Sequence, residues 1–188
     1  MFVEQRWNEN LRIDWSHVKT VWEQHWDLDR PVLLEKSPPN LIRAKQLADH
    51  FDPAYFFVVW RNPYAHCESQ IRRNGNPPMR AAAFAINCLR HQQANIESLD
   101  RVLPISYEQL TEKPKDFAEK ALRFLPELNR ITTTGTFHVH NLRNEALEVT
   151  NLNNEKISRL SVSELQKINE VFVRNQSIMD YFGYNLIK

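Results

Sequence analysis

The sequence predicts an α/β fold in which a mainly parallel sheet, flanked by helices, forms the middle of three layers. Short apolar runs at 31–36, 54–60 and 101–107 alternate with segments of helical periodicity, the pattern of parallel strands joined by helices. The run AYFFVVW at 54–60 is apolar throughout, as in a strand buried on both faces. With 188 residues, 42% of them hydrophobic and 25% charged, we expect a single domain over 1–188.

The first third of the chain predicts two helices and one strand. Asp14 is placed to cap a helix over 15–26, where tryptophans and valines recur at helical spacing. PVLLEK at 31–36 predicts a strand that ends in charge, and the following prolines predict a turn over 37–40. The segment 41–51 is amphipathic and predicts the second helix.

The middle of the chain alternates strands and helices. After the strand at 54–60, Asn62 is a helix cap and Pro63 suits a first helical turn. A loop at 74–78 then leads to a long helix over 79–99. RVLPISY at 101–107 predicts a third strand, although Pro104 cannot donate to a ladder. A helix over 113–125 follows.

The last part of the chain is irregular before it becomes helical. Residues 129–160 are polar and show no sustained period. Ser161 or Ser163 is placed to cap a helix, and Gly183 to end the final one.

Composition excludes several classes of protein. A net charge of +1 leaves no global attraction to nucleic acid, so any anion site is local. Cys67 and Cys88 form neither a disulfide framework nor a zinc pattern, which fits a cytoplasmic protein. No apolar run reaches membrane-spanning length, and the first residues lack a signal-peptide core. His138 and His140 are too few for a metal site, so no metal is expected.

Glycine is scarce. The chain has only three glycines, Gly75, Gly135 and Gly183, and phosphate-cradling loops need glycines at close spacing. Neither GxxxxGK[ST] nor GxGxxG can occur, which disfavours a P-loop kinase relative.

Polar residues gather where the predicted strands end. Lys36 with Glu35, Arg61, and Tyr107 with Ser106 would meet at the carboxyl edge of a parallel sheet, where ligands bind in such folds. Arg61 is followed by a helix N-terminus, and Ser69 shares a face of that helix with Asn62. An arginine, a hydroxyl and helix N–H groups suit a phosphate. The alternative is an ion pair of Arg61 with Glu35 or Glu68.

PVLLEKSPPNLIRAKQLADHF, YFFVVWRNPYAHCES, VLPISYEQL and the closing SVSELQKINEVFVRNQSIMDYFGY resemble the sulfotransferase family. The element R-[ND]-P-x5-S at 61–69 is similar to the family's motif for the 3′-phosphate of the donor, 3′-phosphoadenosine 5′-phosphosulfate (PAPS). The resemblance implies that Arg61 and Ser69 bind this phosphate and that Tyr107 contacts the adenine region. It places Lys36 near the transferring sulfuryl group, where a cation stabilises the leaving oxygen. The alternatives are a core tyrosine and a solvated lysine beside Glu35.

The resemblance implies transfer of a sulfonate group to a hydroxyl or amine of a small-molecule or carbohydrate acceptor. Relatives open with a strand and a P-R-[ST]-G-[ST]-[ST] loop that grips the 5′-phosphosulfate, and this sequence has no such segment. We therefore expect a chain that lacks its first βα unit and self-associates through an exposed sheet edge. The alternative function is an inactive nucleotide-binding or interaction remnant of the fold.

Two parts of the expected site have several candidates. The base that activates the acceptor lies upstream of EKSP in relatives, and none of the candidates there can be singled out: Glu4, Glu9, His17, Glu23 and His25. The irregular region closes over the nucleotide in relatives, so Arg143 and Arg159 are candidates for a second phosphate contact.

Overall fold

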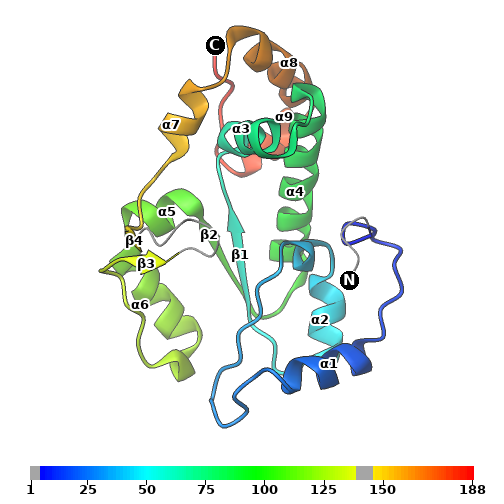
Figure 1. Cartoon of the computed structure of the whole chain (residues 1–188), viewed down its shortest axis with the longest axis vertical. Coiled ribbons are helices and arrows are strands. Elements are labelled where there is room, and N and C mark those ends of the chain that lie inside the picture. Colours follow the sequence, from blue (N-terminus) through cyan, green and yellow to red (C-terminus); the bar gives the residue numbers. More distant parts are fainter. Residues whose placement is uncertain (1–4, 139–145) are drawn as a thin grey trace.

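The computed structural model describes residues 5–138 and 146–188, and it has the predicted α/β class. Strands β1 (Phe56–Trp60) and β2 (Val102–Ser106) form a parallel sheet at the centre of Figure 1. On one side α4 (Pro78–Ser98) packs against both strands. On the other, Phe57 contacts Phe117 and Phe124 of α6 (Pro114–Phe124). The sheet is therefore the middle layer between helices.

The two strands are joined by helices, as the parallel arrangement requires. α3 (Pro63–Asn74) and α4 connect β1 to β2, and α5 (Tyr107–Glu112) follows β2 directly. The remaining elements are α1 (Trp15–Glu23), η1 (Pro38–Ile42), α2 (Ala44–His50), η2 (Pro126–Leu128), β3 (Phe137–His138), β4 (Ala146–Leu147), α7 (Asn153–Ser158), α8 (Val162–Val173) and α9 (Gln176–Tyr181).

Local capping chemistry sets several helix starts. The Asp14 carboxylate accepts a hydrogen bond from the His17 N–H, which begins α1 at the predicted place. Ser161 forms a capping box with Glu164 and begins α8, which decides between the two predicted serines. Gly183, with φ of +73°, follows α9 in the left-handed conformation that glycine favours.

The main core joins the middle of the chain to its C-terminus. Residues of α3 and α4 pack against α8 and α9. Figure 1 shows α3, α8 and α9 beyond the end of β1, beside the part of α4 that extends past the strand. The buried members with least exposure are Tyr64, Cys67, Ala81, Ala82, Ala85, Ile168, Phe172 and Met179. The C-terminal helices are therefore part of the same core as the sheet-connecting helices.

The predicted strand at 31–36 is wrong. This segment has neither helix nor strand, and Leu34 in it is 78% exposed. An apolar run becomes a strand only when a partner strand supplies its backbone hydrogen bonds. In the described part of the chain β1 pairs only with β2, so 31–36 has no such partner. The turn predicted at 37–40 lies in and just before η1.

The prediction of a strand buried on both faces at 54–60 is also wrong. Only Val58 of β1 is buried, and Val59 is 42% exposed. The sheet is narrow, and α6 covers the Phe57 side of β1 without reaching over Val59. An apolar run cannot by itself report how much of a strand its neighbours cover.

The structure also contains two short helices that were not expected from the sequence. β2 ends at Ser106, and Tyr107 opens α5, a helix that was not predicted from the sequence. α7 was also not predicted, within the region expected to be irregular. No helix of the described ranges combines the length and apolar character that crossing a membrane requires.

Candidate functional site

Strand register brings Arg61 and Tyr107 together. Trp60 is opposite Ser106 in the parallel ladder, so the next residue of each strand leaves the sheet at the same edge. The Arg61 guanidinium carbon lies 4.1 Å from the centre of the Tyr107 ring, within the range of a cation–π contact. Two of the three predicted strand ends therefore meet, as the parallel arrangement implied.

The Arg61 guanidinium has one hydrogen bond, at Nε, and a buried nitrogen, Nη2, whose N–H groups have no acceptor among the described residues. Its Nε–H donates to the Asn153 side-chain oxygen at 2.6 Å. A buried donor without an acceptor costs free energy, and an anionic ligand would remove that cost. The open Nη2 is therefore the strongest indication of an anion site here.

The alternative ion pairs of Arg61 do not form. Glu68 instead contacts Lys156 at 3.1 Å and Arg159 at 3.7 Å. Glu35 accepts hydrogen bonds from Ser37 and Asn40. Neither carboxylate neutralises Arg61.

The N-terminus of α3 lies directly after Arg61. The Asn62 side-chain oxygen accepts from the Tyr64 N–H at 2.9 Å and the Ala65 N–H at 3.5 Å, with Pro63 in the first turn as predicted. Two turns on, the Ser69 hydroxyl donates to the Ala65 carbonyl at 3.1 Å. Its oxygen then presents lone pairs, and the hydroxyl must rotate away from Ala65 before it can donate to an anion.

Tyr107 is tied to the segment before α7. Its hydroxyl donates to the Thr150 carbonyl at 2.8 Å and accepts from the Leu152 N–H at 3.2 Å. The ring is partly buried beneath Arg61, at the beginning of α5 and outside the main core.

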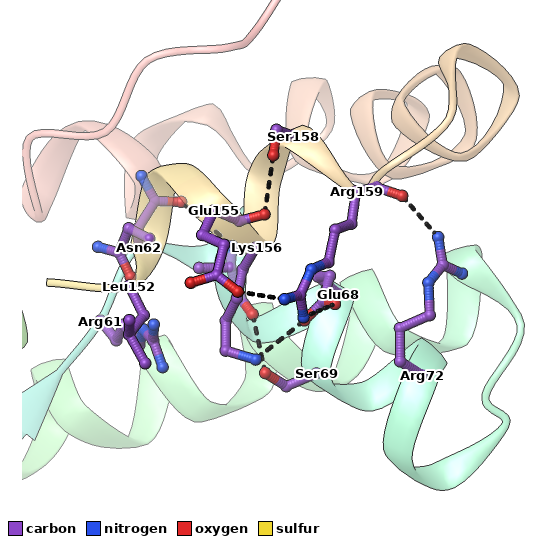
Figure 2. Close-up of polar contacts among 12 residues, drawn as sticks. Arg61, Asn62, Glu68, Ser69, Arg72, Leu152, Glu155, Lys156, Ser158 and Arg159 are labelled. Carbon is purple, nitrogen blue, oxygen red and sulfur yellow. Dashed lines mark hydrogen bonds and ion pairs between the residues drawn. The ribbon is translucent and has the colours of Figure 1, made fainter. Parts of the chain in front are cut away.

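An ion cluster centred on the buried Glu68 docks α7 on α3, as Figure 2 shows. Glu68, 1% exposed, receives Lys156 and Arg159, and Arg159 also pairs with Glu155. Arg72 donates to both carboxylate oxygens of Glu164 and holds the pKa of that group at about 2. The predicted second phosphate residue Arg159 therefore lies at the α3–α7 contact. Arg143 lies outside the described residues.

A sequence model of the sulfotransferase family matches residues 4–128 of the chain. The chain belongs to the sulfotransferase family. No curated protein and no solved structure gave a significant match. The matched region contains β1, α3, β2 and α5, and with them Arg61, Ser69 and Tyr107.

The surroundings of Arg61 are completed by Glu108, within the matched region, and by Asn153 and Tyr184, beyond it. Asn153 lies 92 positions after Arg61 and is 5% exposed. Glu108, beside Tyr107, accepts from the Asn62 N–H at 2.9 Å and from the Tyr184 hydroxyl at 3.1 Å. Neither residue was identified from the sequence. A buried asparagine in an asparagine-rich segment gives no periodic signal that would distinguish it.

Lys36 lies on the irregular segment before η1 and is exposed. It makes no hydrogen bond or ion pair within the described ranges, and Glu35 beside it bonds to Ser37 and Asn40. The structure does not bring Lys36 into contact with Arg61, and its role near the sulfuryl group stays a prediction. His140 lies outside the described residues. Across the ranges that are described, no group of three or more potential ligands could hold a metal.

His66 is a polar residue near Arg61 that no sequence motif marked. It lies on the first turns of α3, and its ring packs edge-on against Phe84 of α4 at 5.6 Å. Burial, and then the positive charge of Arg61, lower the pKa of His66 to about 4. The imidazole is therefore neutral near pH 7.

We expect His66 to make the protein less stable in mild acid. The unfolded His66, with an ordinary pKa near 6.5, takes up a proton between about pH 6.5 and 4 that the folded one does not. Stability therefore falls as pH falls through this window, by at most about 1.4 kcal/mol per pH unit, and levels off below it. Urea denaturation from pH 7 to 4 would show a shallower pH dependence for His66→Gln than for the wild type. His17→Gln, on the exposed surface of α1, is the matched control, and an unchanged slope in His66→Gln would contradict the expectation.

Proposed function

We propose that this sulfotransferase uses PAPS as donor and transfers its sulfonate group to a hydroxyl or amine acceptor. The observation that carries the proposal is the buried Nη2 of Arg61, which has no acceptor in the described part of the chain. This atom lies at the carboxyl edge of a parallel sheet, beside a helix N-terminus that favours anions.

The residues around Arg61 fit the 3′-phosphate of the donor. Arg61 supplies a charged donor, and Ser69 supplies a hydroxyl on the same face of α3 as Asn62. The aromatic ring of Tyr107 suits the adenine region, and its contact with Arg61 supports a site in which the 3′-phosphate and the adenine bind next to each other. Discrimination for a 3′-phosphate follows because a nucleotide without it leaves Arg61 Nη2 unpaired.

In the proposed transfer, the acceptor oxygen or nitrogen forms a bond to sulfur while the bond from sulfur to the 5′-phosphate oxygen breaks. The acceptor proton passes to a base, and the second product is adenosine 3′,5′-bisphosphate. Lys36 would stabilise negative charge on the departing phosphate oxygen, and its exposed side chain is free to turn toward a ligand. A small molecule or a carbohydrate is the proposed acceptor class.

A nucleotide-binding protein without transferase activity is the second candidate. It is favoured by the absence of any glycine-rich phosphate loop in the sequence, since such a loop would grip the 5′-phosphosulfate. Both candidates require the same 3′-phosphate site, and they differ only in whether sulfonate is transferred.

Two measurements test the proposal in order. Titration calorimetry of the full chain with adenosine 3′,5′-bisphosphate should show binding at least about tenfold tighter than with adenosine 5′-monophosphate. Equal affinities, or no binding, would contradict the 3′-phosphate site. A transfer assay with PAPS and a panel of hydroxyl and amine acceptors then separates the two candidates, because only the enzyme releases adenosine 3′,5′-bisphosphate in an acceptor-dependent manner.

A further inference from the structure

We propose that Glu108 and Asn153 are a positioning pair that holds the Arg61 guanidinium in the orientation that leaves Nη2 open to an anion. The inference rests on the proposed 3′-phosphate site and adds two residues to it. Glu108 is on α5 and Asn153 begins α7, so both are outside the Arg61–Ser69 element.

Glu108 gathers donors from three parts of the chain. Its Oε1 accepts from the Asn62 N–H at 2.9 Å and from the Asn153 side-chain amide, and its Oε2 accepts from the Tyr184 hydroxyl at 3.1 Å. Burial, and then the negative charge of Glu108, raise the pKa of Tyr184, so its hydroxyl stays a donor. The carboxylate thereby fixes the backbone directly after Arg61.

The same carboxylate decides which way the Asn153 amide points. An ionised carboxylate only accepts hydrogen bonds, so the NH₂ group of Asn153 must face Glu108. The amide oxygen then faces Arg61, where it accepts from Nε at 2.6 Å. The reversed amide would place NH₂ against the Nε–H of Arg61 and oxygen against the carboxylate, which is unfavourable at both ends.

Asn153 is itself held in place by its surroundings. Its N–H donates to the Asn151 side chain at 2.9 Å, and α7 is docked on α3 through Lys156 and the buried Glu68. Figure 2 shows the start of α7 above Arg61, with the ion cluster further along the two helices. The acceptor for Nε is therefore built into the fold.

These contacts fix the orientation of the Arg61 guanidinium. Asn153 occupies Nε, and the Tyr107 ring covers one face of the guanidinium. These two contacts leave the side chain little freedom to rotate, and Nη2 keeps its buried position without a protein acceptor in the described residues. A donor oriented before the ligand arrives loses less entropy on binding, which favours a nucleotide that carries a 3′-phosphate.

The test separates acceptor geometry from charge at position 108. Glu108→Met removes every acceptor, whereas in Glu108→Gln the amide oxygen can still receive Asn62 and Asn153 while its NH₂ donates to Tyr184. Glu112→Gln is the matched control, since it removes the same charge from α5 while the glutamine oxygen can still accept from Asn151. Asn153→Ala is the second variant, because it removes the acceptor of Arg61 and leaves Glu108 in place.

Two readouts are measured on the full chain. The first is the ratio of calorimetric affinities for adenosine 3′,5′-bisphosphate and adenosine 5′-monophosphate. The second is the NMR signal of the Arg61 Nε–H group, assigned by its loss in Arg61→Lys. We expect Glu108→Met and Asn153→Ala to lower the affinity ratio about tenfold and to broaden or shift the Nε–H signal. Glu108→Gln and Glu112→Gln should keep both within about twofold of the wild type.

The outcomes distinguish the positioning pair from the proposed function. An unchanged ratio and an unchanged Nε–H signal in Glu108→Met and Asn153→Ala would overturn the positioning role. Equal weakening of both nucleotides, in step with lost stability, would assign the two residues a structural role and also overturn it. A wild-type chain without preference for the 3′-phosphate would overturn the proposed function, while the Nε–H signal would still decide whether the pair fixes Arg61.

Discussion

Replacing Arg61 by alanine is expected to weaken binding of adenosine 3′,5′-bisphosphate by about 2–4 kcal/mol, the range for a buried charge-assisted contact. The affinity for adenosine 5′-monophosphate should barely change, because this nucleotide has no 3′-phosphate for Nη2 to meet. Arg61 is the residue with a buried open donor at the sheet edge, so its loss removes the main source of discrimination. Titration calorimetry with both nucleotides measures the two effects on the same protein.

Two further variants sharpen the Arg61 result. Arg61→Lys keeps the charge but loses the Nε contact to Asn153, so it should recover only part of the affinity. Arg72→Ala is the control: Arg72 lies on α3, the helix that follows Arg61, and pairs with Glu164. Its loss should leave the preference for adenosine 3′,5′-bisphosphate over adenosine 5′-monophosphate intact. Equal losses for both nucleotides in Arg61→Ala would mean that the 3′-phosphate is bound elsewhere.

Phe172→Ala is expected to destabilise the fold by about 3–5 kcal/mol, which is a large part of the stability of a domain of this size. Phe172 is fully buried, and its ring packs edge-on against Tyr64 with 4.9 Å between the ring centres. Because α8 carries Phe172 into the core formed with α3, the cavity would loosen the helix that bears Ser69. Urea denaturation followed by circular dichroism gives the loss directly.

The neighbouring residue provides the control. Val173 is 57% exposed, and Val173→Ala should change stability by no more than about 0.5 kcal/mol. If 1–188 is one domain, as we propose, both variants should unfold in a single transition that is the same whichever spectroscopic signal is followed. A separate transition for the C-terminal helices would show that the core is divided.

Local sequence signals predicted much of this fold. Asn62 and Pro63 predicted the start of α3 correctly, because side-chain capping by Asn62 and the fixed φ of Pro63 both act within one helical turn. Val102–Ser106 forms a strand although Pro104 has no N–H group to donate. β2 is an edge strand of the described sheet, so one of its sides has no partner strand and the missing N–H is tolerated there. The run at 31–36 failed as a strand because pairing depends on a partner that no local pattern contains.

The candidate site was predicted in part for the same reason. Arg61, Ser69 and Tyr107 could be named because strand ends and a short motif mark them. Asn153 and Glu108 could not be, because their importance depends on which atoms they meet. The placement of Lys36 relative to the other predicted residues depended equally on the path of an irregular segment.

By itself, the sequence determined that Arg61 ends an apolar strand, that a capped helix follows it, and that no glycine-rich phosphate loop exists in this chain. These are properties of neighbouring residues, fixed by backbone conformation and side-chain chemistry over a few positions. The tertiary structure alone decided that Asn153 accepts from Arg61, that Glu108 orients Asn153, and that Glu68 is neutralised by α7 and leaves Arg61 open. Those contacts join residues 45 to 92 positions apart, and they form only because packing of α7 on α3 and of β1 beside β2 brings the partners together.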